Sequence, residues 1–126
     1  MIKIEFDVMG KKWVVRVLKH KKYSKKNGED SLAVTLSWKR RMDITLPGVN
    51  LETIVHELTH AYLAEMCVSS CNEITLEDQE EVFAELLAKR GRELLDTADK
   101  LHAEIIKQIE HKAAIQKEEK LLLIKP

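Results

Sequence analysis

Cysteine and proline are scarce in this chain of 126 residues, which contains two of each. Cys67 and Cys71 are too few for the disulfide framework of a small secreted domain, so the sequence predicts a reducing, cytoplasmic compartment. No linker rich in Gly, Pro or Ser and no internal repeat divides the chain. We therefore expect a single domain, residues 1–126, with one hydrophobic core.

Long apolar runs are also missing. The first ten residues, MIKIEFDVMG, alternate in polarity and lack the apolar run of a signal peptide. No stretch approaches the length needed to span a membrane. The sequence therefore predicts a cytoplasmic protein without a membrane partner.

The net charge is zero, but the charges are unevenly distributed. Residues 1–41 contain 12 Lys or Arg against 4 Asp or Glu, a balance of +8, and the rest contain 9 against 17, a balance of −8. Halves of opposite charge attract each other within one fold, and we favour this interpretation. The alternative is a basic partner-binding end, in which the lysines of residues 19–26 and the segment Trp38 to Arg41 contact nucleic acid. No recognition-helix motif accompanies these residues.

Residues 1–46 have the pattern of β-strands. IKIEFDV alternates in polarity over residues 2–8, and β-branched residues return in WVVRVL at 13–18, which together predict a hairpin. The polar stretch 19–30 predicts a basic loop with a turn at Asn27-Gly28. LAVTLSW and MDITL then supply one or two further strands.

The remainder of the chain has a helical pattern. Asn50 and Thr75 are the expected N-caps of a helix over about 51–67 and of a second helix that begins near residue 76. The pattern then continues either as one long helix or after a break near Gly91 or Asp96. Two helices at least therefore follow the strands.

The order of these elements predicts an α+β fold. A small antiparallel sheet forms a basic, β-rich half over residues 1–46, and residues 50–126 form an acidic, helical half with a long C-terminal helix. The apolar stripe of the C-terminal helix would pack on its own domain or form a dimer seam, and the apolar run LLLI at 121–124 would suit a partner, which leaves the oligomeric state open.

VHELTHAY, residues 55–62, places His56, Glu57 and His60 in an H-E-x-x-H arrangement. Histidines four residues apart on a helix lie one above the other, so both can bind one Zn²⁺ at about 2.0–2.1 Å. Glu57 lies beside this ridge, where it can reach a water on the metal rather than the metal itself. The apolar residues Leu58 and Tyr62 fall on roughly the opposite face. This pattern predicts a metal site in which Glu57 is the general base.

A catalytic zinc needs a third protein ligand. The segment EDQEEVFAELLA offers Glu81, with Glu80 as the alternative, because a sequence places helix boundaries only to within a few residues. Glu85 lies one turn further along the same ridge and would hydrogen-bond a ligand histidine, which fixes the tautomer of the ring. Ala84 and Ala88 flank this ridge and would let the two helices approach closely.

Two cysteines and three histidines lie outside this set. Cys67 shares the face of the histidines and Cys71 follows it, so a second metal site or a redox pair is an alternative to two ordinary reduced cysteines, which we favour. His20, His102 and His111 are expected to be surface or packing residues.

HELTH followed by EEVFAE resembles the gluzincin branch of zinc metallopeptidases, in which a glutamate on a following helix completes the H-E-x-x-H site. The run from Glu81 to Ala84 is also similar to the glutamate-x-Phe-Ala segment of zinc aminopeptidases. The resemblance implies that His56, His60 and Glu81 bind Zn²⁺ and that Glu57 is the general base. It covers residues 44–88 and extends to compact H-E-x-x-H proteins of phages and mobile elements, and distantly to ImmA/IrrE-type peptidases.

Two features depart from that family. No residue matches the Tyr or His that larger gluzincins use to stabilise the oxyanion, although Tyr23, Tyr62 and His102 are available. The chain is also too short for a second domain, so the site would be open or completed by a protein partner. We expect a zinc-dependent peptidase acting on a peptide or protein. The alternative is a non-catalytic, metal-stabilised regulatory protein that contacts a host protein or nucleic acid through its basic half, and a third interpretation has no metal.

Overall fold

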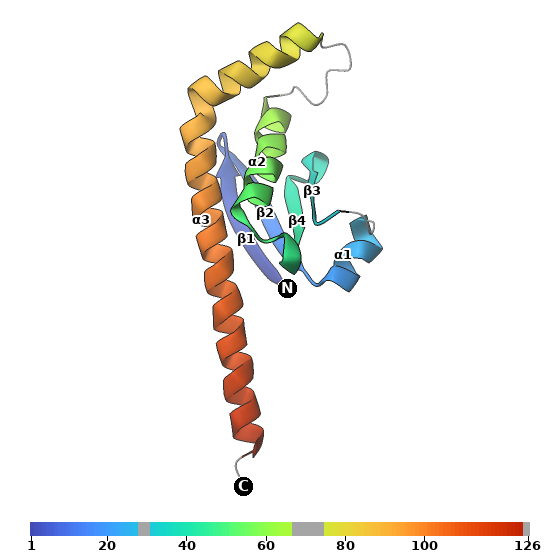
Figure 1. Cartoon of the computed structure of the whole chain (residues 1–126), viewed down its shortest axis with the longest axis vertical. Coiled ribbons are helices and arrows are strands. Elements are labelled where there is room, and N and C mark those ends of the chain that lie inside the picture. Colours follow the sequence, from blue (N-terminus) through green and yellow to red (C-terminus); the bar gives the residue numbers. More distant parts are fainter. Residues whose placement is uncertain (28–30, 67–74, 125–126) are drawn as a thin grey trace.

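In the part of the chain that the structure describes, the fold consists of four strands, three α-helices and two short 3-10 helices, η1 (Ser37–Lys39) and η2 (Leu46–Gly48) (Figure 1). The computed structural model describes residues 1–27, 31–66 and 75–124. The strands β1 (Ile2–Val8), β2 (Lys11–Leu18), β3 (Ala33–Leu36) and β4 (Arg41–Thr45) form one sheet in the order β1-β2-β4-β3. The α+β class predicted from the sequence is confirmed.

The predicted hairpin joins β1 to β2. The two strands are antiparallel, with Phe6 paired to Trp13 and Val8 to Lys11. Both turn residues have positive φ, 49° at Met9 and 80° at Gly10. Positive φ at both central positions is the requirement of a two-residue type I′ turn, whose twist matches that of the flanking strands. Gly10 meets this requirement without steric cost, because it has no Cβ.

The sheet is mixed rather than antiparallel. β3 and β4 pair antiparallel, as β1 and β2 do, but β2 and β4 pair parallel, with Val15 opposite Met42 and Val17 opposite Ile44. The prediction of an antiparallel sheet is wrong at this pair. The reason is the connection, because helix α1 and strand β3 intervene between β2 and β4 and return the chain to the starting end of β2.

The basic segment after β2 is a helix, α1 (His20–Asn27), and not the predicted loop. Lysine is a good helix former, and a single apolar side chain holds the helix to the sheet. Tyr23 is fully buried, and its hydroxyl oxygen lies 2.6 Å from Oγ of Ser31. Gly28, the second residue of the predicted turn, is outside the described residues.

Beneath α1, the sheet contains a buried ion pair between β2 and β4. Arg16 donates from Nε and Nη2 to the two carboxylate oxygens of Asp43, at 2.8 Å each, and Asn27 of α1 donates to the same carboxylate at 3.1 Å. Burial alone would raise the pKa of Asp43, but the hydrogen bonds from Arg16 and Asn27 outweigh it and lower the pKa below its usual value. These bonds join α1 to this face of the sheet.

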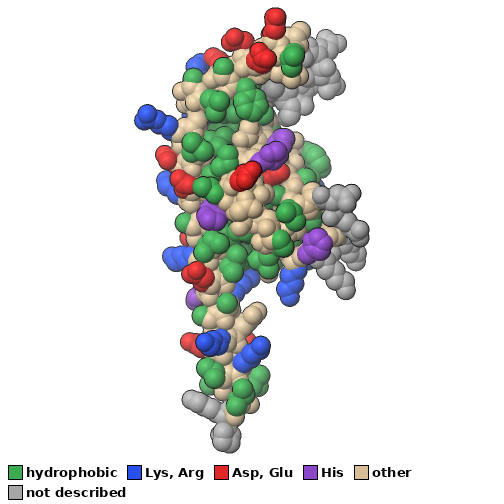
Figure 2. Space-filling view, viewed as in Figure 1, with side chains coloured by type: hydrophobic (Ala, Val, Ile, Leu, Met, Phe, Trp, Pro, Cys, Tyr) green, Lys and Arg blue, Asp and Glu red, His purple; other side chains and the backbone are tan. Residues whose placement is uncertain are grey.

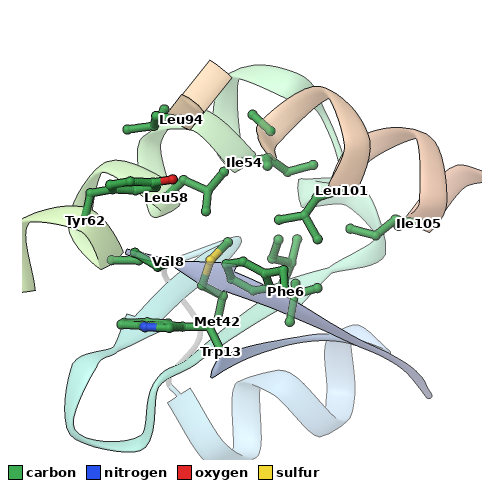
Figure 3. Close-up of a cluster of buried hydrophobic side chains, with 14 of the residues drawn as sticks. Phe6, Val8, Trp13, Met42, Ile54, Leu58, Tyr62, Leu94, Leu101 and Ile105 are labelled. Carbon is green, nitrogen blue, oxygen red and sulfur yellow. The ribbon is translucent and has the colours of Figure 1, made fainter. Parts of the chain in front are cut away.

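The opposite face of the sheet carries the hydrophobic core (Figure 3). Helix α2 (Leu51–Glu65) begins as predicted at Asn50, whose Oδ1 accepts a 2.8 Å hydrogen bond from the backbone N of Thr53. Ile54, Leu58 and Tyr62 of α2 are fully buried. They pack in one cluster with side chains of the sheet and of the last helix, among them Phe6, Val8, Trp13, Met42, Leu94, Leu101 and Ile105.

The last helix, α3 (Leu76–Ile124), is continuous, so of the two alternatives left open by the sequence the structure has the single long helix rather than a break near Gly91 or Asp96. Figure 1 shows its first part turned away from the long remainder, which runs along the domain and projects beyond it. The side chains at 110–124 are exposed, including the apolar run at 121–124. Among the described residues, none of the helices combines the length and the apolar character needed to cross a membrane.

Candidate metal centre

Three residues of α2 bring potential metal ligands together. One ligand atom each from His56, Glu57 and His60 lies within 4.8 Å of the others. Both histidines are exposed, and Figure 2 shows histidine at the molecular surface over α2. The group follows from the one-turn spacing on a helix whose other face is buried in the core, as the sequence predicts.

The two histidine rings have a separation that suits a metal. Nε2 of His56 lies 3.3 Å from Nε2 of His60, and the ring centroids are 5.0 Å apart with an edge-on angle of 72°. Two nitrogens bound tetrahedrally to one zinc at about 2.0–2.1 Å lie about 3.3–3.4 Å apart. Without a metal, the same contact is a hydrogen bond between the two rings, which a bound cation would replace. The donor set therefore fits a divalent cation.

Glu57 differs from the histidines in its environment. Its side chain is 5% exposed, and its Oε2 accepts a 3.1 Å hydrogen bond from Oγ1 of Thr35 in β3. The same hydroxyl lies 3.1 Å from the backbone oxygen of Glu57. The carboxylate is therefore held at the junction of α2 and the sheet, beside the histidines.

Thr35 was not among the residues that the sequence singled out. No motif identifies it, because its role depends on the packing of β3 against α2. Within the described part of the chain, β3 pairs with β4 and lies at the end of the strand order. Its outer edge thus presents backbone donors and acceptors next to the Glu57 side chain.

The structure does not bring Glu81 to the histidines. Glu80, Glu81 and Glu85 are all exposed on the first part of α3, and Glu85 forms a 3.0 Å ion pair with Lys89. The first buried residue of α3 is Leu86. At 100° per residue, Glu81 projects about 140° around the helix from Leu86 and so away from the packed face. Its role as third ligand, and that of Glu85 beside a ligand ring, stay predictions.

The close approach predicted at Ala84 and Ala88 is also not observed, because both residues are exposed. α3 packs on the core instead through Leu86, Leu94 and Ala98. The packing of α3 on the core therefore begins at Leu86, more than one turn beyond Glu81. The first part of the helix lies outside this packed region (Figure 1).

The other candidate residues are buried, lie on the packed length of α3 or fall outside the described residues. Tyr23 and Tyr62 are fully buried, and burial raises the pKa of each hydroxyl. His102 is half-buried on the packed length of α3. Cys67 and Cys71 lie outside the described residues.

The end of α2 is fixed to the sheet by Glu65. Its Oε1 accepts from Nε1 of Trp13 at 2.9 Å and from Nε of Arg40 at 2.7 Å. Burial would raise the pKa of Glu65, but these two donors outweigh it and lower the pKa. Arg40, which lies in the segment that the sequence suggested for contact with nucleic acid, is thus engaged within the protein, whereas Trp38, two residues earlier, is 76% exposed.

Comparison of the chain with family models, with curated proteins and with solved structures gave no match. The geometry of His56, Glu57 and His60 therefore carries the functional argument alone.

Proposed function

We propose that the protein is a zinc-dependent metallopeptidase whose site is built on α2. The observation that carries this proposal is the 3.3 Å separation of the two Nε2 atoms, beside a buried carboxylate. A pair of histidines alone occurs on many metal-binding surfaces and does not indicate catalysis. A carboxylate adjacent to them in sequence and within 4.8 Å of both supports a catalytic role, because hydrolysis by a metal-bound water needs a proton acceptor beside the metal.

His56 and His60 would hold the metal, and Glu81 remains the predicted third ligand. A bound Zn²⁺ would polarise a carbonyl and make water acidic enough to ionise near neutral pH. Glu57 would accept the proton of the attacking water and pass it to the leaving amine. Thr35 would hold the carboxylate of Glu57 in place through its 3.1 Å hydrogen bond.

The position of β3 favours a peptide as the substrate. An extended peptide can add to the exposed edge of a sheet through main-chain hydrogen bonds. β3 provides such an edge, and Thr35 within it contacts Glu57. A peptide on this edge would therefore run past the proposed base, close to the two histidines.

The first test is metal analysis of protein purified with zinc present. We expect about one equivalent of zinc per chain in wild type, and less than about half an equivalent would count against every zinc interpretation.

The second test compares the cleavage of a peptide library by Glu57→Gln and by Glu52→Gln, both at full zinc occupancy. Glu52 is an exposed acid in the first turn of the same helix, so its variant should cleave as wild type does. Equal cleavage by wild type and Glu57→Gln, or cleavage by neither, would refute catalysis.

A second candidate is a non-catalytic protein in which the metal stabilises the fold. The exposed position of Glu81 favours this candidate. Without Glu81, the metal ligands that the described residues offer are the two histidines and Glu57, and the Glu57 carboxylate already accepts a hydrogen bond from Thr35. The basic helix α1, which has no acidic residue in its first turn, would contact the partner. In this case a chelator should lower the melting temperature sharply, while Glu57→Gln leaves partner binding unchanged.

A further inference from the structure

A cavity separate from the histidines lies between the start of β1, the end of β2 and α3. Its volume is about 490 Å³, which is within the range of roughly 300–1,000 Å³ for small-molecule sites. It shares no lining residue with the group formed by His56, Glu57 and His60. Its occupant is therefore independent of the proposed peptidase activity.

The lining of this cavity combines an apolar wall with a basic rim. The apolar side chains come from both strands and from α3, and include Ile2, Val17, Leu18, Ile109 and Ala113. Ile2, Val17 and Leu18 are buried and form the floor, so the apolar surface open to a ligand comes mainly from the half-buried Ile109 and the exposed Leu46 and Ala113. Lys19, Lys22 and Lys112 complete the lining, and no Asp or Glu is among the residues that line it.

Three lysines and the Met1 amino group bring positive charge to the rim of the cavity. Nζ of Lys112 donates a 2.9 Å hydrogen bond to the backbone oxygen of Met1, which places this ammonium at the mouth of the cavity. The pKa of the Met1 amino group is lowered, mainly by the adjacent Lys112 ammonium and further by partial burial and by repulsion from Lys22 and Lys19. An anion bound among these lysines would relieve this repulsion.

We propose that this cavity binds a single-chain anionic amphiphile, a long-chain carboxylate, with its tail on the apolar wall and its head group among Lys19, Lys22 and Lys112. A neutral apolar ligand would leave the lysines unpaired, and a small inorganic anion would leave the apolar wall exposed to water. A carboxylate with an alkyl chain satisfies both parts of the lining.

The test uses dodecanoate, below its critical micelle concentration, titrated into the full-length protein in a calorimeter. We expect saturable binding of one dodecanoate per chain, weakened by added salt. The double variant Lys22→Glu/Lys112→Glu should bind at least about tenfold more weakly, since two favourable charges become unfavourable. Lys107→Glu is the matched control, because Lys107 is exposed on α3 and does not line the cavity. It should bind as wild type does.

The location is tested by methyl NMR and by a blocking variant. Dodecanoate should shift the methyl signals of Ile2, Val17 and Ile109, and leave those of Leu58 under the histidines unchanged. Ala113→Trp, which fills the cavity from α3, should abolish binding while circular dichroism shows the same helix content.

Three results would overturn the proposal. One is equal affinity for dodecanol and dodecanoate, and another is equal affinity in the double variant and in Lys107→Glu. The third is a protein-concentration-dependent shift of the same methyl signals with no effect of dodecanoate, which would assign the cavity to a second copy of the chain.

Discussion

The hydroxyl oxygen of Thr35 lies 3.1 Å from the carboxylate of Glu57 and ties the edge strand β3 to the buried acid of α2. Removing one partner leaves a buried polar group unsatisfied, which costs about 1–3 kcal/mol. Thr35→Val, which keeps the shape of the side chain, should therefore lower the free energy of unfolding by that amount. Urea denaturation followed by circular dichroism measures the change.

Thr35→Ser is the control for this variant, because it keeps the hydroxyl and removes one methyl group. We expect it to retain most of the stability, within about 1 kcal/mol of wild type. If the two variants are equally destabilised, the packing of the methyl group matters and the hydrogen bond to Glu57 does not.

Zinc should stabilise the folded protein through His56 and His60. A ligand that binds only the folded state adds about 2.7 kcal/mol at a concentration 100 times its Kd, so the melting temperature should rise as zinc is added. His60→Ala should remove most of this rise. His111→Ala should keep it, because His111 is exposed on α3 and is not in the group. Differential scanning calorimetry with and without zinc compares the three proteins, and a rise retained by His60→Ala would contradict the site.

The sequence was informative where one local pattern determines the structure. Alternating polarity predicted β1, and the spacing of His56 and His60 predicted their approach on α2, because both depend only on the period of one element. Asn50 likewise caps α2 as predicted, since an N-cap contacts a backbone group three residues away.

The predictions that were wrong, or that stay open, depend on how elements distant in the sequence pair or pack against one another. The sequence of α1 contains one apolar residue, the buried Tyr23, and a single apolar residue gives no helical period to detect. The parallel pairing of β2 and β4 follows from the path of the chain between them. Glu81 as the third ligand stays a prediction: its spacing along the chain is suitable, but it is exposed on α3 ahead of Leu86, the first buried residue of that helix.

Leu86 and Leu87 test where α3 joins the core. Leu86 is 1% exposed and Leu87 is 63% exposed, although the two are neighbours with the same side chain. Leu86→Ala should lower the free energy of unfolding by about 2–5 kcal/mol, because it removes buried methyl groups and leaves a cavity. Leu87→Ala should change it by less than about 0.5 kcal/mol. Chemical denaturation measures the free energy of unfolding of both variants. Equal losses would mean that the packing of α3 on the core does not begin at Leu86 as the structure shows.

Asp43 should make the stability of the protein depend on pH in the acid range. Its carboxylate is fully buried and its pKa in the folded protein is lowered, mainly by the hydrogen bonds from Arg16 and Asn27 that overcome the effect of burial. An unfolded Asp has a pKa of about 3.9, so at acid pH the unfolded chain binds a proton more readily than the folded one. The stabilisation from Asp43 is therefore fully present above about pH 5 and is lost as the pH falls toward the lowered pKa.

Asp43→Asn should remove this dependence together with the charge. At pH 7 it should cost about 3–5 kcal/mol, because it leaves the largely buried guanidinium of Arg16 without its counter-ion. The loss should shrink as the pH falls below about 4, where wild type loses the same stabilisation. Asp7→Asn is the control, since Asp7 pairs with Lys12 at 3.4 Å on the exposed surface and should cost less than about 1 kcal/mol. Urea denaturation of the three proteins between pH 7 and pH 3 measures both effects. A difference between wild type and Asp43→Asn that stays constant over this range would show that the carboxylate does not titrate as the Arg16 pair requires.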